Sequence, residues 1–198
     1  MAVDKPDASG NPPSASELQA EIGRLTDELV QARCRIVELE NRSELDPLLE
    51  ILNRRGFERE LARSISFVKR YGTPAALVYI DLDGFKAVND EHGHAAGDAL
   101  LKAVVRQLTS HVRGSDTVAR LGGDEFAVLM WNVDVIHASA KARELEGVIA
   151  AASAGDATTR YSVGASAGIA ALSGDVTPDT IIDAADKGMY ARKKERRG

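Results

Sequence analysis

The chain has 198 residues, of which 44% are hydrophobic and 28% are charged, and its formal net charge at pH 7 is −5. This length suits one domain of about 150 residues with a shorter additional segment, and the apolar fraction suffices for a packed core. The net negative charge disfavours non-specific binding to nucleic acid, which needs a basic surface, so we expect a nucleotide ligand to be small.

Cysteine content and hydropathy indicate the compartment. The single cysteine, Cys34, excludes an internal disulfide and fits a reducing environment. Residues 1–14 contain no apolar run typical of a signal peptide, and no later stretch approaches the roughly 18 apolar residues of a membrane span. We therefore expect a cytoplasmic protein without a membrane span.

The first 45 residues predict a disordered start followed by a long helix. Residues 1–13 are dominated by small polar residues and proline, so we expect disorder there. Ser14 and Glu17 fit a capping box, in which each side chain accepts a hydrogen bond from a free amide at a helix start. Over residues 14–45 apolar side chains recur in heptads, with Ile22, Leu29 and Ile36 in one series and Leu18, Leu25, Ala32 and Leu39 in the other.

This heptad pattern predicts a parallel two-stranded coiled coil that forms a homodimer. Charges at the flanking positions agree, because Glu28 and Arg35 at g would face Arg33 and Glu40 at the following e positions of the partner. With only about three heptads, the alternative is one amphipathic helix packed on its own domain. The helix could also bind a protein partner of unknown identity.

Residues 46–198 predict a compact domain in which helices alternate with strands. The expected helices cover residues 53–71, 97–112, 135–152 and 178–194, with a short helical turn before the second. The expected strands cover residues 75–80, ending at Asp81, then 117–121 and 126–130, with a strand or hairpin within 161–172. This order predicts an α/β fold, an α+β sandwich in which helices flank a central, mainly antiparallel sheet.

The most informative segment is residues 120–126, Arg-Leu-Gly-Gly-Asp-Glu-Phe. Two glycines between β-prone runs indicate a hairpin, and glycine allows positive φ and close approach of a ligand to the backbone. The adjacent carboxylates of Asp124 and Glu125 would then face a metal ion or a phosphate. Glu125 could instead bond a nearby backbone amide.

A second acidic segment, residues 81–90, begins where the first long strand ends. Asp81 would lie at a sheet edge and, with Asp124, could bind a divalent cation, since hard oxygen ligands suit Mg²⁺. Gly84 and Phe85 would open the next helical turn with free amides that can hold a phosphate. Alone, an Asp-x-Asp pair is weak support, because such pairs commonly cap turns.

These two segments and the closing run at residues 185–193, Ala-Asp-Lys-Gly-Met-Tyr-Ala-Arg-Lys, together resemble the GGDEF-domain diguanylate cyclases. The resemblance extends from about Asp46 to Arg197 and leaves the coiled-coil segment outside. It implies a nucleotidyl-cyclase-like palm that condenses two GTP into cyclic di-GMP and two pyrophosphates across a homodimer interface.

The resemblance also implies metal and substrate contacts at the matching positions. Magnesium, two ions per site with Mn²⁺ as a substitute, would be bound by Asp81, Asp124 and the main-chain carbonyl of Leu82. Guanine would be recognised by Asn89 and Asp98. Phosphates would be contacted by the amides of Gly84 and Phe85 and by Lys193 and Arg197. The residues implied for catalysis are Asp124, Glu125 and Lys86, and the proton acceptor is left open between Asp124 and a metal-bound water.

A further implied site would bind the product. Arg113 and Asp116 match the family's inhibitory Arg-x-x-Asp site for cyclic di-GMP, and Arg143 is a candidate additional contact. Spacing alone would favour a surface ion pair or a turn.

One departure and one alternative accompany the resemblance. Family members usually have Thr-Gly where this chain has Leu49-Glu50, so a position suited to positive φ is lost and the joint between helix and domain is expected to differ. The main alternative function is a catalytically silent module that senses GTP or cyclic di-GMP and signals through its coiled coil. Another purine nucleotidyl cyclase or a polymerase-like transferase is disfavoured by the specific hairpin.

Overall fold

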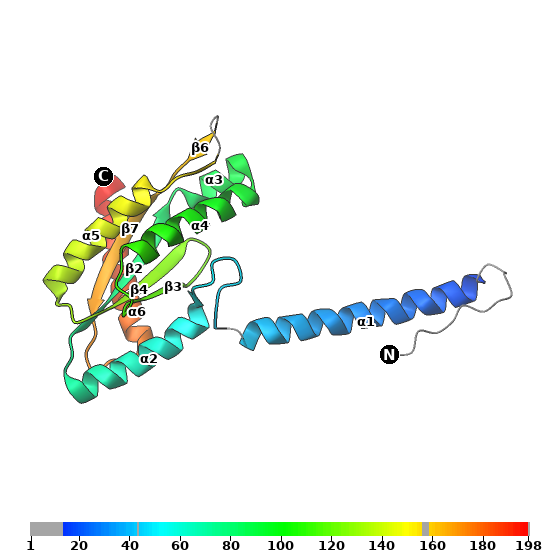
Figure 1. The fold of residues 1–198 in the computed structure, drawn as a ribbon, viewed down its shortest axis with the longest axis horizontal. Helices are drawn as coiled ribbons and strands as arrows, with labels where there is room; N and C mark the ends of the chain where they lie inside the picture. The colour runs from blue at the N-terminus through cyan, green and yellow to red at the C-terminus, as the bar shows by residue number, and fades with distance from the viewer. Residues whose placement is uncertain (1–13, 43, 156–158, 198) are drawn as a thin grey trace. The chain divides into compact units, whose positions relative to one another are not determined.

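The computed structural model describes residues 14–42, 44–155 and 159–197 (Figure 1). The chain divides into two compact units, residues 1–43 and residues 44–198. The disorder predicted for residues 1–13 lies outside the described residues. Within the described ranges, every helix lacks the length or the apolar character that crossing a bilayer requires.

The first unit contains α1, Ala15–Arg42. The predicted capping box at its start is confirmed, because the amide of Glu17 donates to Ser14 Oγ at 3.3 Å and the amide of Ser14 donates to Glu17 Oε2 at 2.7 Å. The hydrogen bond from the Ser14 amide, assisted by the Ser14 hydroxyl, lowers the pKa of Glu17.

The apolar stripe of α1 is exposed. Ala32 is exposed, and the larger described members, which are between 49% and 63% exposed, are Leu18, Ile22, Leu25 and Leu29. Glu28 pairs with Arg24 of its own helix at 2.5 Å. An exposed stripe at heptad spacing is consistent with a coiled coil, which stays a prediction. The side chains of Ile36, Leu39 and Glu40 lie outside the description.

The second unit is built on a five-stranded sheet with the order β1-β3-β4-β2-β7. Its strands are β1 (Leu52–Asn53), β3 (Thr117–Arg120), β4 (Glu125–Trp131), β2 (Ala75–Asp83) and β7 (Gly164–Ala171). Strands β1 and β3 run parallel, and the other neighbours run antiparallel. A small separate sheet pairs β5 (Ala154–Gly155) with β6 (Arg160–Tyr161). The predicted fold class, with its mainly antiparallel central sheet, is confirmed.

Helices cover both faces of the central sheet (Figure 1). One face carries α3 (Phe85–His92), α4 (His94–Ser110) and α5 (Val135–Ala151), and the other carries α2 (Arg54–Tyr71) and α6 (Pro178–Arg197). Strand β2 contributes to both cores, with Val78 and Ile80 in the first and Leu77 and Tyr79 in the second. Because side chains alternate along a strand, Asp81 and Asp83 project toward the face covered by α2 and α6.

Capping residues place most helix boundaries close to the predicted ones. Asn53 Oδ1 accepts from the amide of Gly56 at 2.9 Å, so α2 begins at Arg54, and Gly72 ends it with a φ of 68°. Strand β2 is longer than predicted, because β7 pairs with it as far as Asp83 opposite Gly164. Helix α4 begins earlier than predicted, directly after Gly93, and α6 continues to Arg197.

The outer strand β7 has one of its amides bonded by a side chain. The amide of Ala167 donates to Glu146 Oε1 of α5 at 2.8 Å. Glu146 is 5% exposed, and its Oε2 lies 3.5 Å from Arg192 Nη2 of α6. A buried carboxylate requires such partners, so these contacts hold α5 and α6 against β7.

Candidate active site

The pairing register places three polar side chains in one row across the sheet. Asp81 of β2 is the direct partner of Glu125 of β4 and of Ser166 of β7. Directly opposed residues of antiparallel strands point to the same face. The row therefore lies on the face covered by α2 and α6, at the end of β2 next to the Gly-Gly segment.

Lys193 of α6 reaches this row, because α6 packs on the same face of the sheet. Its ammonium contacts Asp81 Oδ1 and lies 3.1 Å from Asp83 Oδ1. Burial lowers the pKa of Lys193, but the hydrogen bond to Asp81 and the negative charges of Asp81 and Asp83 outweigh burial, so the pKa is raised overall. The structure thus joins the closing motif of the chain to its acidic segment.

A glycine contact sets how closely α6 approaches the sheet. A Cβ added to Gly168 of β7 would lie 2.0 Å from the carbonyl oxygen of Ala185 and 2.1 Å from the amide nitrogen of Met189. Both atoms belong to the backbone of α6, so they cannot move aside as a flexible side chain can. Gly168 therefore permits the spacing at which Lys193 meets Asp81.

The Gly-Gly turn does not use the positive φ that the sequence suggested, since neither Gly122 nor Gly123 lies in that region. Its shape is held by Arg120, whose guanidinium donates to the carbonyls of Gly122 at 3.0 Å and Gly123 at 2.8 Å. Arg120 Nη1 also pairs with Asp46 Oδ2 at 3.1 Å, and both side chains are largely buried. Arg120 therefore ties the turn to the start of the domain, a link that sequence spacing did not reveal.

Glu125 supports the turn as well as facing the site. A Cβ on Gly122 would lie 2.4 Å from Glu125 Oε2, so the carboxylate lies over Gly122 and would have to shift to admit a side chain there. Arg54 Nη2 lies 3.8 Å from the same oxygen. Burial, followed by a hydrogen bond to Glu125, raises the pKa of the Tyr79 hydroxyl.

The predicted guanine contacts are brought together at the junction of α3 and α4. Gly84 precedes α3 with a φ of 85°, a left-handed conformation that favours glycine. A Cβ on Gly97 would lie 2.0 Å from Asn89 Oδ1, so Asn89 packs against the first turn of α4, which also carries the exposed Asp98.

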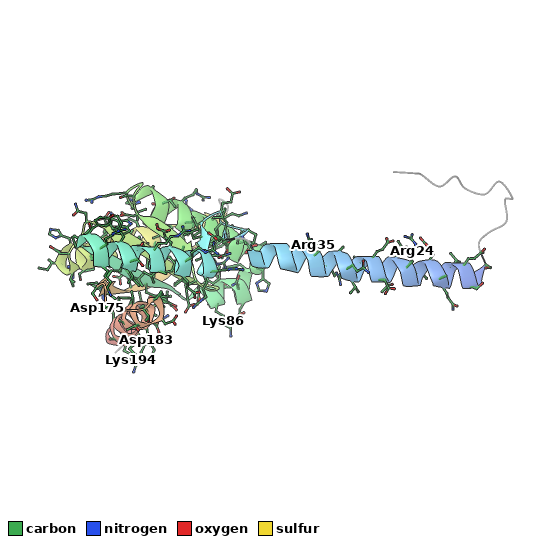
Figure 2. The ribbon with its side chains drawn as sticks, turned by 90° about the horizontal axis from the view of Figure 1, so that it is seen from below. Arg24, Arg35, Lys86, Asp175, Asp183 and Lys194 are labelled. Carbon is green, nitrogen blue, oxygen red and sulfur yellow. The ribbon has the colours of Figure 1, made fainter. Side chains whose placement is uncertain are left out.

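Lys86, which was predicted to act in catalysis, is exposed and projects away from the domain (Figure 2).

The acidic residues suit a divalent cation that is shared with a bound ligand better than one held in an all-protein metal cage. Among the described residues, no group of three or more His, Cys, Asp or Glu side chains could hold a metal ion. Nucleotide-bound Mg²⁺ commonly uses one or two carboxylates, with water and phosphate completing its shell. Asp81, Asp124 and the Leu82 carbonyl suit that pattern, because the amide of Leu82 donates to the carbonyl of Asp124 at 3.0 Å and joins the two segments.

The predicted inhibitory residues Arg113 and Asp116 line a cavity of about 270 Å³. His111, Trp131, His137 and Lys141 are among its other lining residues. Arg143 is not placed there by the structure; it lines a different pocket with Glu146 and Arg192. The reason is helical geometry, since Arg143 follows Lys141 by two residues and so points about 200° around α5. The side chain of Arg197, another predicted contact, lies outside the description.

The sequence matches a known domain family. Residues 43–198 match the family described as diguanylate cyclase, GGDEF domain. Diguanylate cyclase TpbB of Pseudomonas aeruginosa (strain UCBPP-PA14) is 34% identical over 192 residues, which are 92% of this chain and 43% of that protein. The chain therefore spans less than half the length of such curated relatives.

Solved structures of related domains share the fold. A sensory box/GGDEF family protein from Caulobacter crescentus CB15 is 36% identical, with a TM-score of 0.71, over 77% of this chain and 99% of that one. Diguanylate cyclase SiaD of Pseudomonas aeruginosa, solved with its activator SiaC, is 28% identical, with a TM-score of 0.73, over 89% of this chain and 68% of that one. Together with the match over residues 43–198, these similarities show that the chain belongs to the GGDEF diguanylate cyclase domain family.

Proposed function

We propose that this domain is a diguanylate cyclase, which condenses two GTP into cyclic di-GMP and releases two pyrophosphates. The observation that carries the proposal is the contact of Lys193 with Asp81. It brings together two segments, 112 residues apart, that the family resemblance assigns to phosphate and metal binding. The similarity to TpbB over 92% of this chain gives independent support.

The site residues would position one GTP in each domain. Mg²⁺ bound through Asp81, Asp124 and the Leu82 carbonyl would offset triphosphate charge and promote ionisation of the attacking 3′-hydroxyl. Gly84 and the first amides of α3 would hold phosphate oxygens, because the amides at a helix start have no partner within the helix. Asn89 and Asp98 offer the acceptors and donors that a guanine edge requires.

Two loaded domains would complete the reaction together. The 3′-hydroxyl of one GTP attacks the α-phosphate of the other, and the reciprocal attack closes the ring. Holding the two domains near each other replaces a chance encounter by an effectively intramolecular step. We propose that α1 provides this proximity as a parallel coiled coil, and the SiaD–SiaC complex supports a protein activator for this chain too.

The dimer proposal has a matched pair of variants. Leu25 lies in the apolar stripe of α1 and is 50% exposed, whereas Val30, 53% exposed, lies outside the heptad series. Leu25→Asp is expected to give a monomer by sedimentation equilibrium and to reduce cyclic di-GMP formation at least tenfold, because proximity is lost. Val30→Asp should remain dimeric, and a fully active monomeric parent would contradict the proposal.

The cavity at Arg113 is proposed to bind the product and inhibit the enzyme. It is lined by the Arg113 guanidinium and by Trp131, so that it offers a cationic group and an aromatic surface, whereas Lys141 is already paired with Glu144 at 2.7 Å. Arg113→Ala should weaken inhibition by added cyclic di-GMP at least fivefold, because a guanidinium is a strong phosphate partner. Unchanged inhibition would assign the product contact to another surface.

The central experiment is incubation of the full chain with GTP and Mg²⁺, followed by mass spectrometry of the products. Asp124→Asn is expected to abolish cyclic di-GMP formation. Asp175→Asn, at an exposed position (Figure 2), is the control that should retain it. GTP binding without turnover by the folded dimer, with or without a candidate activator, would favour the sensor alternative.

A further inference from the structure

Asp83 is an acidic residue at the site to which the family resemblance gave no role. It lies two residues beyond Asp81 on β2, on the same face of the sheet. Its Oδ1 is buried and lies 3.1 Å from Lys193 Nζ without making a hydrogen bond of good geometry. Its Oδ2 accepts a hydrogen bond from Ser166 Oγ at 2.8 Å, and Ser166 is completely buried.

Asp81 and Asp83 therefore share one ammonium but differ in how firmly they are held. Asp83 has a fixed donor, since Ser166 belongs to β7 and its hydroxyl is enclosed. Within the described part of the chain, the Asp81 side chain makes no hydrogen bond or ion pair other than that with Lys193. Asp81 can thus exchange its partner while Asp83 stays in place.

We propose that Asp83, oriented by Ser166, is a positioning residue for Lys193. It provides a second anionic contact that keeps the ammonium at the site when Asp81 exchanges lysine for a divalent cation. Without Asp83, Lys193 would depend on Asp81 alone and would compete directly with the cation. This inference rests on the proposed function, because it takes Asp81 as a metal ligand.

The proposal predicts how variants bind Mn²⁺ in the absence of nucleotide, measured on the full chain by the electron paramagnetic resonance signal of free Mn²⁺. Asp83→Asn should weaken Mn²⁺ binding about tenfold. Lys193→Met should strengthen it, because a competitor is removed. In the Lys193→Met background, Asp83→Asn should weaken binding less than about threefold, since only its direct charge effect on the ion remains.

Ser166→Ala separates position from charge. It leaves every charge in the site unchanged but frees Asp83, so Mn²⁺ binding should weaken about three- to fivefold. The control is Asp183→Asn at an exposed position of α6 (Figure 2). It breaks the pair between Asp183 and Lys187 and should leave Mn²⁺ binding unchanged. Circular dichroism and thermal melting verify that each variant is folded.

Two outcomes would overturn the proposal in distinguishable ways. Equal effects of Asp83→Asn with and without Lys193, together with parent-like binding by Ser166→Ala, would show that Asp83 acts only through its charge. The metal site itself would then stand. A folded parent that binds no Mn²⁺ without nucleotide would overturn this inference, and one that also binds none together with a non-hydrolysable GTP analogue would overturn the metal site on which the proposed function depends.

Discussion

Two regions of the domain use carboxylates in opposite ways. At the end of β2, Asp81 and Asp83 face the side-chain cation of Lys193. In the turn at residues 113–116, the carboxylate of Asp116 accepts the amide of Arg113 at 3.0 Å and that of Trp131 at 3.1 Å. Asp81 can change partner by moving one lysine, whereas Asp116 cannot do so without releasing backbone amides.

A family motif therefore does not determine whether its acidic residue faces a ligand or accepts hydrogen bonds from the backbone. The resemblance assigned ligand contacts to Asp81 and Asp116 alike, yet Asp116 has both oxygens engaged in fixing the turn and the end of β4. Arg113 is exposed and lies beside the cavity, so it is the better placed of the pair to meet a ligand. The structure therefore supports the turn reading of Asp116 that spacing alone favoured.

The largest loss of stability is expected where α6 packs on β7, because this contact positions Lys193. Gly168→Ala would place a methyl group within 2.1 Å of two backbone atoms of α6, and it should lower the free energy of unfolding by about 3 kcal/mol. Lys193 would be displaced with α6, so cyclase activity should fall as well. Gly188→Ala is the control, because its nearest contact is 3.7 Å and alanine favours helix, giving a gain of about 0.5–1 kcal/mol in urea unfolding.

The next largest loss of stability is expected in the turn at residues 113–116. Asp116→Ala leaves the amides of Arg113 and Trp131 without their acceptor and should destabilise the domain by about 2 kcal/mol. Arg113→Ala, at an exposed side chain, should change stability by less than about 0.5 kcal/mol. Equal losses in urea unfolding would contradict the assignment of Asp116 to the backbone.

A smaller effect concerns a position where the backbone favours glycine and the sequence supplies an acid. Glu50 has a φ of 57°, so the joint keeps the left-handed conformation that the loss of the family's glycine was expected to alter. Glu50→Gly should stabilise the domain by about 0.5–1 kcal/mol, because a side chain is disfavoured there. Glu50→Ala, which retains a Cβ, should give no such gain; equal stabilisation would point to the charge instead.

The smallest effect is expected at the start of α1, where Glu17 accepts a hydrogen bond from the Ser14 amide. The pKa of Glu17 in the folded state is lowered from 4.5. Its stabilisation of the helix start is therefore present above pH 4.5 and is lost as the pH falls through the folded-state pKa. The helical signal of the full chain should therefore decline slightly more below pH 4.5 than that of Glu17→Gln. Identical pH profiles by circular dichroism would exclude this contribution.

Local signals predicted most elements because caps and apolar periodicity act over a few residues. Asn53 and Gly72 bound α2, and the apolar run of β2 identified a strand covered on both faces. The two-residue strands β1, β5 and β6 escaped prediction, since they are too short to show a period. Their existence depends on partners distant in the sequence.

The candidate site was predictable only as separate segments. Family motifs singled out Asp81, Asp124 and Lys193, but the contact of Lys193 with Asp81 and Asp83 arises from the register of β2 and from the packing of α6 on Gly168. Ser166 escaped notice because one serine in a strand of small residues has no distinctive pattern. A polar residue on an otherwise apolar strand face was the available signal.

The outer strands of the central sheet affect how two copies can separate. Strand β1 is only two residues long, and the Ala167 amide of β7 is already bonded to buried Glu146. An outer strand with unpaired amides can extend its sheet into another chain, and both features reduce that tendency. In the proposed dimer, two domains that meet face to face would therefore part without breaking a shared sheet, so that their union would be reversible and a product formed between them could leave.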